Sequence, residues 1–187
     1  MPPKVKVTKE DIVNAAVSIV RENGAEALNA RTVAAALGCS TQPVFSNFAS
    51  MDELRLALVA KASGLYGEYI RREVGRGEFP AYKASGMAYI RFAGEERELF
   101  KLLYMRDRTN EQPPETDEHG DAMAALVQQN TGLDEPTARL FHLEMWAYVH
   151  GIAVLIATGF AQLEWTLVSR MLTDAYLGMR KHYGMEE

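Results

Sequence analysis

Four small polar side chains follow one another over a short stretch of the chain, and all four can hydrogen-bond to nucleic-acid bases: Thr41, Gln42, Ser46 and Asn47. The amides of Gln and Asn can pair with adenine in the major groove through two hydrogen bonds, and a threonine methyl can contact thymine. Val44 and Phe48 lie at helical spacing on the opposite side. This pattern predicts a helix that reads base edges, and the alternative is an ordinary solvated helix face.

The preceding residues predict the elements that hold this helix in place. Val33, Ala34 and Leu37 form the apolar stripe of a short helix that ends at Gly38. Ser40 can cap the next helix, and Pro43 falls in its first turn, where a missing N–H costs little. A short helix, a glycine turn and a second helix form a helix-turn-helix.

Phosphate contacts are expected at the start of the first of these two helices. Arg31 and Thr32 lie there, where a side chain or the N–H groups of the helix N-terminus can bind a phosphate. Lys4, Lys6 and Lys9 precede any acidic residue and form a small basic arm. Residues 1–61 carry a net charge of +1 and residues 62–187 one of −6, so only one end of the protein suits DNA.

Helical periodicity extends through the whole chain and predicts an all-α protein of about nine helices. The first helix opens with Thr8 and Asp11 as a capping box and closes at Asn23-Gly24. A second capping box, Ser50 with Glu53, opens a long fourth helix. We expect a helix-turn-helix domain over residues 1–50 and a C-terminal helical bundle over 51–187, with the fourth helix linking the two.

The last two predicted helices are apolar on most sides, and a helix of that kind needs partners on most sides. We therefore expect a dimer interface built as a four-helix bundle, whose candidate residues are Ala147, Gly151, Leu155, Leu167, Val168, Met171, Leu172 and Ala175. The alternative is a buried helical hairpin within a monomer.

Residues 8–60 resemble the DNA-binding domain of the TetR/AcrR family of bacterial regulators. The resemblance rests on Ile12-Val-Asn-Ala-Ala16, Asn23-Gly24, Thr32-Val-Ala34, Gly38-Cys-Ser40, Val44-Phe-Ser-Asn-Phe48 and Asp52-Glu-Leu54, each at the family's spacing. It implies a homodimer that binds a palindromic operator on double-stranded DNA. It further implies that a small-molecule effector in the C-terminal domain changes the separation of the recognition helices and releases the DNA, as expected of a repressor.

The predicted DNA-binding residues are Lys4, Lys6, Arg31, Thr32, Ser40, Thr41, Gln42, Pro43, Phe45, Ser46 and Asn47. Two positions depart from the family pattern. Phe45 replaces the usual Tyr and lacks its phosphate hydrogen bond, and Met51 replaces the usual Lys and lacks its charge. We therefore expect weaker and less salt-sensitive DNA binding than is usual for the family, unless the arm lysines compensate.

The C-terminal domain resembles the family more loosely. Trp146-Ala-Tyr-Val-His150-Gly151 resembles the subgroup named for its Trp…His-Gly signature. Trp146 and His150 lie on one face of their helix with His142, and Gly151 on the next stripe allows close helix approach. They either line an effector pocket or form a packed Trp with a hydrogen-bonded core histidine. The candidates for a largely apolar pocket are Phe92, Tyr104, Met105, Met123, Trp146 and His150.

Other functions find little support in the sequence. It contains no nucleophile motif, phosphate-binding loop or paired carboxylates, so we expect no enzyme, no cofactor and no metal site. No apolar run approaches a membrane span, no signal peptide is evident and the single cysteine suits a reducing compartment, so we expect a cytoplasmic bacterial protein, nucleoid-associated when bound to its operator. The alternative function is a helical homodimer of the same descent that has weak or no DNA binding and acts through protein contacts. An unrecognised enzymatic pocket is a third reading.

Overall fold

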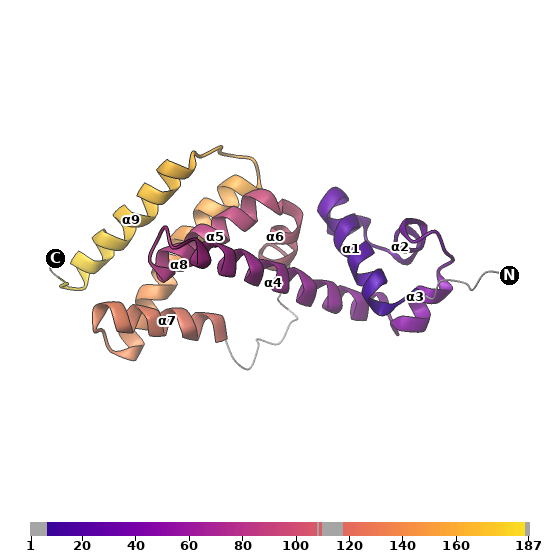
Figure 1. Cartoon of the computed structure of the whole chain (residues 1–187), viewed down its shortest axis with the longest axis horizontal. Coiled ribbons are helices and arrows are strands. Elements are labelled where there is room, and N and C mark those ends of the chain that lie inside the picture. The colour runs from indigo at the N-terminus through magenta and orange to yellow at the C-terminus, as the bar shows by residue number, and fades with distance from the viewer. Residues whose placement is uncertain (1–6, 108, 110–117, 186–187) are drawn as a thin grey trace. The chain divides into compact units, whose positions relative to one another are not determined.

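A computed structural model describes residues 7–107, 109 and 118–185, and these residues form nine α-helices, one short 3-10 helix and no strand (Figure 1). The all-α prediction is confirmed. In chain order the elements are α1 (Lys9–Asn23), the 3-10 helix η1 (Ala25–Ala27), α2 (Ala30–Ala36), α3 (Gln42–Asn47), α4 (Met51–Arg76), α5 (Ala81–Glu95), α6 (Arg97–Tyr104), α7 (Glu118–Thr131), α8 (Glu135–Ala157) and α9 (Trp165–His182).

Side-chain caps set where the first helices begin. Thr8 and Asp11 form the predicted capping box at α1, and Gly24 ends that helix with a positive φ of 81°. The prediction for α3 needs correction, because Thr41 and not Ser40 occupies its N-cap position. Thr41 already has helical backbone angles and its side chain makes no capping hydrogen bond, which leaves the hydroxyl free of a structural task in the cap.

The chain folds into two compact units. The first unit comprises Met1–Gly67 and Glu96–Arg106, and the second unit comprises Glu68–Glu95 and Asp107–Glu187. This division differs from the sequence expectation of a boundary at residue 50. It differs because α6 packs against α1, and because α4 belongs to the first unit for most of its length and to the second unit at its C-terminal end.

The first unit is built around the inner faces of α1 to α4. Val44 of α3 and Phe48 just beyond it are 1% exposed, and Ile12 of α1, Val33 of α2 and Leu54 of α4 are fully buried. Burial of each such side chain contributes about 1.5–3 kcal/mol, so α3, which has only six residues, owes its position to this core and not to intrinsic helicity.

The second unit is centred on the packing of α5 against α8 and α9, with α7 lying along α8 (Figure 1). Two glycines of α5 permit close approach. A Cβ atom at Gly86 would lie 3.3 Å from Leu172 Cδ1, and one at Gly94 would lie 3.3 Å from Ile156 Cγ2. The expected close approach at Gly151 is not found within the protomer, because a Cβ atom there would meet nothing within 4 Å.

Helix α8 is apolar on its inner and its outer side. Phe141, Met145 and Val149 point into the second unit, whereas Leu140 and Leu143 are 50% and 57% exposed. By length and composition alone this helix could cross a membrane, since an 18-residue window has a mean hydropathy of 1.5, and only 33% of that window is buried. The outer side of α8 is therefore an exposed apolar surface, of the kind that often marks an interaction site.

Candidate functional site

Helix α3 turns one side to the core and leaves the other open. Val44 is buried, whereas Gln42, Phe45 and Ser46 are exposed, and Phe45 reaches an exposed fraction of 54%. A ring this exposed adds little to the buried core of the first unit. Of the four residues chosen from the sequence for base contact, Gln42 and Ser46 are therefore exposed, whereas Thr41 and Asn47 are half-buried, which makes Gln42 the most available amide.

Two of the predicted base-reading side chains hydrogen-bond within α3 itself. Ser46 Oγ donates to the Gln42 carbonyl oxygen at 2.9 Å, and Asn47 Nδ2 donates to the Pro43 carbonyl oxygen at 2.8 Å. A pair of hydrogen bonds to adenine needs the amide donor of Asn47 as well as its acceptor. The Asn47 amide nitrogen carries two hydrogens, so one can stay on the Pro43 carbonyl while the other is offered to adenine, in the orientation that the bond to Pro43 sets.

The start of α2 is already capped by the protein. Asn29 Oδ1 accepts from the N–H groups of Arg31 and Thr32 at 3.0 and 3.1 Å, and Thr32 Oγ1 accepts the Asn29 N–H at 3.1 Å while its own hydrogen can go to the Ala27 carbonyl at 2.8 Å. Thr32 thus serves as the second half of a capping box, which leaves the exposed Arg31 guanidinium as the group best placed for phosphate. The sequence did not reveal this use of Thr32, although Asn29 followed three residues later by a hydroxyl was a usable signal.

Lys9, the last lysine of the expected basic arm, is paired with a carboxylate. Lys9 Nζ lies 2.9 Å from Glu53 Oε1 and 4.6 Å from the centre of the Phe48 ring. Glu53 also accepts the Ala49 N–H, and the hydrogen bond from Lys9 is the main reason why the pKa of Glu53 lies below its usual value. Lys4 and Lys6 lie outside the described residues. Phe45 has no hydroxyl and Met51 has no charge with which to bind a phosphate, and the Lys9 ammonium is paired with Glu53.

The six residues predicted to line an effector pocket belong to different units. Tyr104 and Met105 are in the first unit, where Tyr104 packs on Phe100 with ring centres 5.1 Å apart. The other four are in the second unit: Phe92, Met123, Trp146 and His150. Phe92 is fully buried and Met123 is 9% exposed, so both already serve as core side chains there.

Trp146 and His150 do lie together, as their spacing predicts. Their rings stack with centres 5.0 Å apart, and His150 Nδ1 lies 2.9 Å from the hydroxyl of Tyr89 on α5. His142 makes the same kind of contact to Tyr82 at 3.1 Å. Burial lowers the pKa of His150 and so favours its neutral form. These contacts agree with the alternative in which His150 is hydrogen-bonded within the protein. Trp146 is only partly packed, because 38% of its surface is exposed.

The predicted dimer residues separate into an outer and an inner group. Ala147, Gly151, Leu155 and Leu167 are exposed, as the prediction requires. Val168 and Leu172 are 0% and 3% exposed and cannot contact a second chain, because α9 turns them against the second unit's own core. Met171 is half-buried, and Ala175 is half-buried against the core cluster around Phe141. The outer group instead extends to Leu140 and Leu143, which the sequence analysis did not select.

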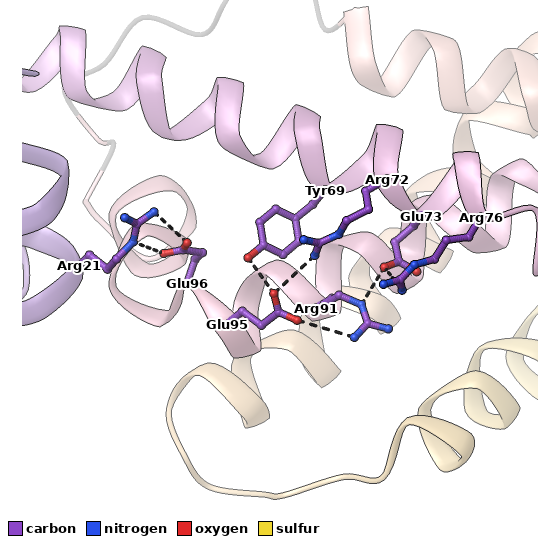
Figure 2. Close-up of polar contacts among 8 residues, drawn as sticks. All are labelled: Arg21, Tyr69, Arg72, Glu73, Arg76, Arg91, Glu95 and Glu96. Atoms are coloured by element: carbon purple, nitrogen blue, oxygen red, sulfur yellow. Dashed lines mark hydrogen bonds and ion pairs between the residues drawn. The ribbon is translucent and has the colours of Figure 1, made fainter. Parts of the chain in front are cut away.

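A charged cluster in the second unit also escaped the sequence analysis (Figure 2). Glu73 of α4 is 2% exposed and binds Arg76 Nη1 at 2.7 Å and Arg91 Nε, from α5, at 2.8 Å. The Arg91 guanidinium also lies 4.3 Å from the centre of the Trp165 ring at the start of α9. Glu73 lies at the helical spacing of the buried apolar residues of α4. This position was the sign in the sequence that a charged cluster forms here, because a buried carboxylate needs partners.

An open groove of about 420 Å³ crosses the outer side of α8 and α9. Its lining residues are Glu144, Tyr148, Asp174, Ala175, Gly178, Met179 and His182, none of which was chosen for the effector pocket. In the described part of the chain, no group of three or more histidine, cysteine or acidic side chains could hold a metal ion.

Comparison with known proteins places the chain in a family. Residues 82–175, half of the sequence, match the family model for the tetracyclin repressor-like C-terminal domain. Among curated proteins, a search finds no match.

Solved structures share the fold over nearly the whole chain. A TetR-like transcriptional regulator from Rhodococcus sp. RHA1 is 18% identical, with a TM-score of 0.69 over 98% of this chain and 99% of its own. A TetR family member from Streptomyces coelicolor A3 is 18% identical, with a TM-score of 0.63 over 89% and 96%. The multidrug binding protein EbrR, complexed with malachite green, is 22% identical, with a TM-score of 0.61 over 92% and 98%. The chain thus belongs to the TetR family of non-enzymatic, ligand-responsive transcriptional regulators.

Proposed function

We propose that this regulator is a repressor that binds a palindromic operator as a homodimer and leaves it when a small molecule binds the C-terminal domain. The observation that carries the proposal is the exposed side of α3, on which Gln42 and Phe45 project from a helix fixed by the buried Val44 and Phe48. A helix held from behind with a polar and aromatic free side suits insertion into the major groove.

The outer side of α8 supports the homodimer. Leu140, Leu143 and Leu155 are each more than a third exposed, and the small residues Ala147 and Gly151 lie between Leu143 and Leu155. Small residues between leucines let two helices approach closely, and a self-complementary patch is what a two-fold dimer requires. In such a dimer the two α3 helices would enter successive major grooves about 34 Å apart.

The effector is proposed to be a small, largely apolar molecule. EbrR, which shares this fold, has been solved with malachite green, and that dye is a suitable first probe. Both tryptophans of this chain, Trp146 and Trp165, lie in the second unit, so quenching of their emission would report binding there. The protein is expected in the cytoplasm, associated with the nucleoid when bound to its operator.

Selection of bound fragments from random DNA, at low and at physiological salt, tests the proposal. We expect a palindromic consensus. Loss of the Gln42 amide in Gln42→Ala should weaken binding to it by a factor of about 5–150, the value of about 1–3 kcal/mol of base discrimination. The matched control is Gln129→Ala, at an exposed position of α7, which should leave the affinity unchanged.

The second candidate function is a homodimer that binds DNA weakly and acts through protein contacts. Three residues favour it. Phe45 and Met51 lack the usual phosphate anchors, and Lys9 is paired with Glu53. Failure to enrich any fragment at either salt concentration, from a protein that is folded and dimeric, would favour this function over the repressor.

A further inference from the structure

Lys83, in the first turn of α5, has an amine that is enclosed by uncharged groups of the second unit. Its Nζ donates to Thr173 Oγ1 on α9 at 2.8 Å and lies 4.5 Å from the centre of the Phe79 ring, which precedes α5. All three residues belong to the second unit. The side chain is only half-buried, so a small reagent in solution has access to it.

The other lysines that the structure describes have different surroundings. Lys9 and Lys101 are bound to carboxylates at 2.9 and 2.6 Å, whereas Lys61 and Lys181 are exposed to water. Among the described residues, none forms an ion pair with Lys83. This amine therefore combines partial burial with the lack of a counter-ion, a combination that none of the other four shows.

The charged residues beside these contacts do not compensate. Asp174, which follows Thr173 on α9, is paired with Arg170 at 3.5 Å, and Glu78, which precedes Phe79, is exposed and not bonded to Lys83. Burial without a carboxylate disfavours the ammonium form and lowers the pKa of Lys83 from its ordinary value, although the nearby ring attracts the cation. A larger share of this side chain is thus neutral amine near neutral pH than in an exposed lysine.

The hydrogen bond to Thr173 also orients the neutral amine. The Thr173 hydroxyl donates to the Ser169 carbonyl oxygen at 3.0 Å, so its oxygen accepts from Lys83. A neutral amine carries two hydrogens and one lone pair. One hydrogen is held by Thr173, and the lone pair, which this bond does not use, is left for an electrophile.

We propose that Lys83 is a modification site that takes an acyl group from acyl phosphates. The neutral amine attacks the acyl carbon, the bond from that carbon to the phosphate oxygen breaks, inorganic phosphate leaves, and the nitrogen passes a proton to water. The product is an uncharged amide, which keeps one N–H for Thr173 but has no charge above the Phe79 ring. The site is separate from the proposed function and does not depend on DNA binding.

Acylation at this position should loosen α9 from α5. Lys83 lies one helical turn before Gly86, and Thr173 follows Leu172. A Cβ atom at Gly86 would lie only 3.3 Å from Leu172 Cδ1, so the two helices have little spare room at that point. An acyl group on Lys83 adds volume beside this contact and removes a charge, and both changes weaken the packing of the pair.

The rate of acetylation of each lysine tests the site. The full chain is incubated with acetyl phosphate at about pH 8, and mass spectrometry of its peptides gives the initial rates. Lys83 should react about twofold or more faster than Lys61 and Lys181, since far below the pKa the free-amine fraction rises in proportion to the acid dissociation constant. The ratio should decrease as the pH approaches about 10, near the ordinary lysine pKa. Equal rates at pH 8, or a ratio that does not depend on pH, would overturn the proposal.

A variant that supplies the missing carboxylate gives a second test. Thr173→Asp should favour the ammonium form of Lys83 and slow its acetylation by about threefold to tenfold, toward the rate of the paired Lys101. The matched control is Thr166→Asp, at an exposed position of the same helix, which should leave the rate at Lys83 unchanged. Circular dichroism confirms that both variants are folded. An unchanged rate at Lys83 in folded Thr173→Asp would contradict the assignment.

Thermal unfolding tests the effect on α9. Lys83→Gln has an uncharged amide like that of the acylated side chain, whereas Lys83→Arg keeps the charge. The melting temperature of the glutamine variant should be lower than that of the arginine variant by about 2–4 °C, a usual shift for a modest destabilisation in a chain of this size. Lys181→Gln, at an exposed position near the end of α9, should cause no such decrease. Equal melting temperatures of the two Lys83 variants would overturn the loosening of α9.

Discussion

At the scale of single residues, the first unit, which we propose to bind DNA, contains cations whose charge is already balanced by neighbouring carboxylates. Lys9 is bound to Glu53, and Arg55 lies 3.1 Å from Asp52. Both pairs sit near the start of α1 or α4, where a basic residue would be most useful for phosphate. The affinity for DNA thus depends on which partner each cation keeps when the nucleic acid arrives, and this competition can be tested with one substitution.

Glu53→Gln should free Lys9 while retaining an oxygen that can accept the Ala49 N–H. We expect tighter DNA binding at low salt and a steeper dependence of log K on log salt, by up to about 0.9 per protomer for one added phosphate contact. Fluorescence anisotropy of labelled DNA over a salt series measures both quantities. Glu22→Gln carries the same charge change away from Lys9, and an equal effect there would rule out this explanation.

Burial of His150 should make stability depend on pH. Its pKa is lowered from the ordinary 6.5, so the unfolded chain takes up a proton at a higher pH than the folded chain does. The free energy of unfolding should therefore fall as the pH drops from about 7.5 to about 5.5, on either side of the ordinary histidine pKa. Urea unfolding at both pH values checks this. The decrease should be smaller in His150→Asn, and an undiminished decrease would assign it to other groups.

At the residue scale, the sequence predicted exposure and burial correctly where these depend only on which face of a helix a residue occupies. The exposure of Gln42 and Phe45 and the burial of Val44 follow from the spacing of apolar residues within α3. The partners of Lys9 and Arg21 could not be predicted, because they lie 44 and 75 residues away along the chain. Tertiary packing decides which side chains meet at such separations, and a local sequence pattern carries no information about that packing.

At the scale of helices, the glycines show how closely neighbours approach. Gly64 of α4 faces open space, whereas Gly86 of α5 faces Leu172 and Val149. The helix ends were largely predictable, since caps such as Thr8–Asp11 and Asp134 are local signals. The close contact of α5 with α8 and α9 was not, and the sequence analysis assigned the role of close approach to Gly151 instead.

Alanine substitutions at two helical glycines should therefore differ in sign or size. Gly64→Ala should stabilise the protein by about 0.5–1 kcal/mol, because alanine is the better helix former and its methyl group meets nothing. Gly86→Ala should gain less than this or lose stability, since its Cβ atom would lie 3.3 Å from the buried Leu172. Urea midpoints of the two variants provide the comparison, and equal gains would contradict the packing described for α5.

At the scale of the whole molecule, the outer side of α8 should determine the oligomeric state. Leu143 is 57% exposed at the middle of this helix. Leu143→Glu should place two like charges near the two-fold axis of the proposed dimer and shift the protein toward monomer, as sedimentation velocity would show. The matched control is Leu56→Glu on α4, where the leucine is 71% exposed outside α8. A dimer that survives the change at Leu143 must use another surface.

The composition of the first unit from two separate segments has a consequence for protein engineering. Residues 96–106 are inserted into a unit otherwise made of residues 1–67, and Leu99 and Phe100 of this insert are fully buried. A hybrid regulator that joins this N-terminal half to a foreign ligand-sensing half at one crossover point would discard these residues. Such hybrids should fail to fold as intended unless the transplanted part carries α6 as well, so the exchangeable module is defined by packing and not by a single cut in the sequence.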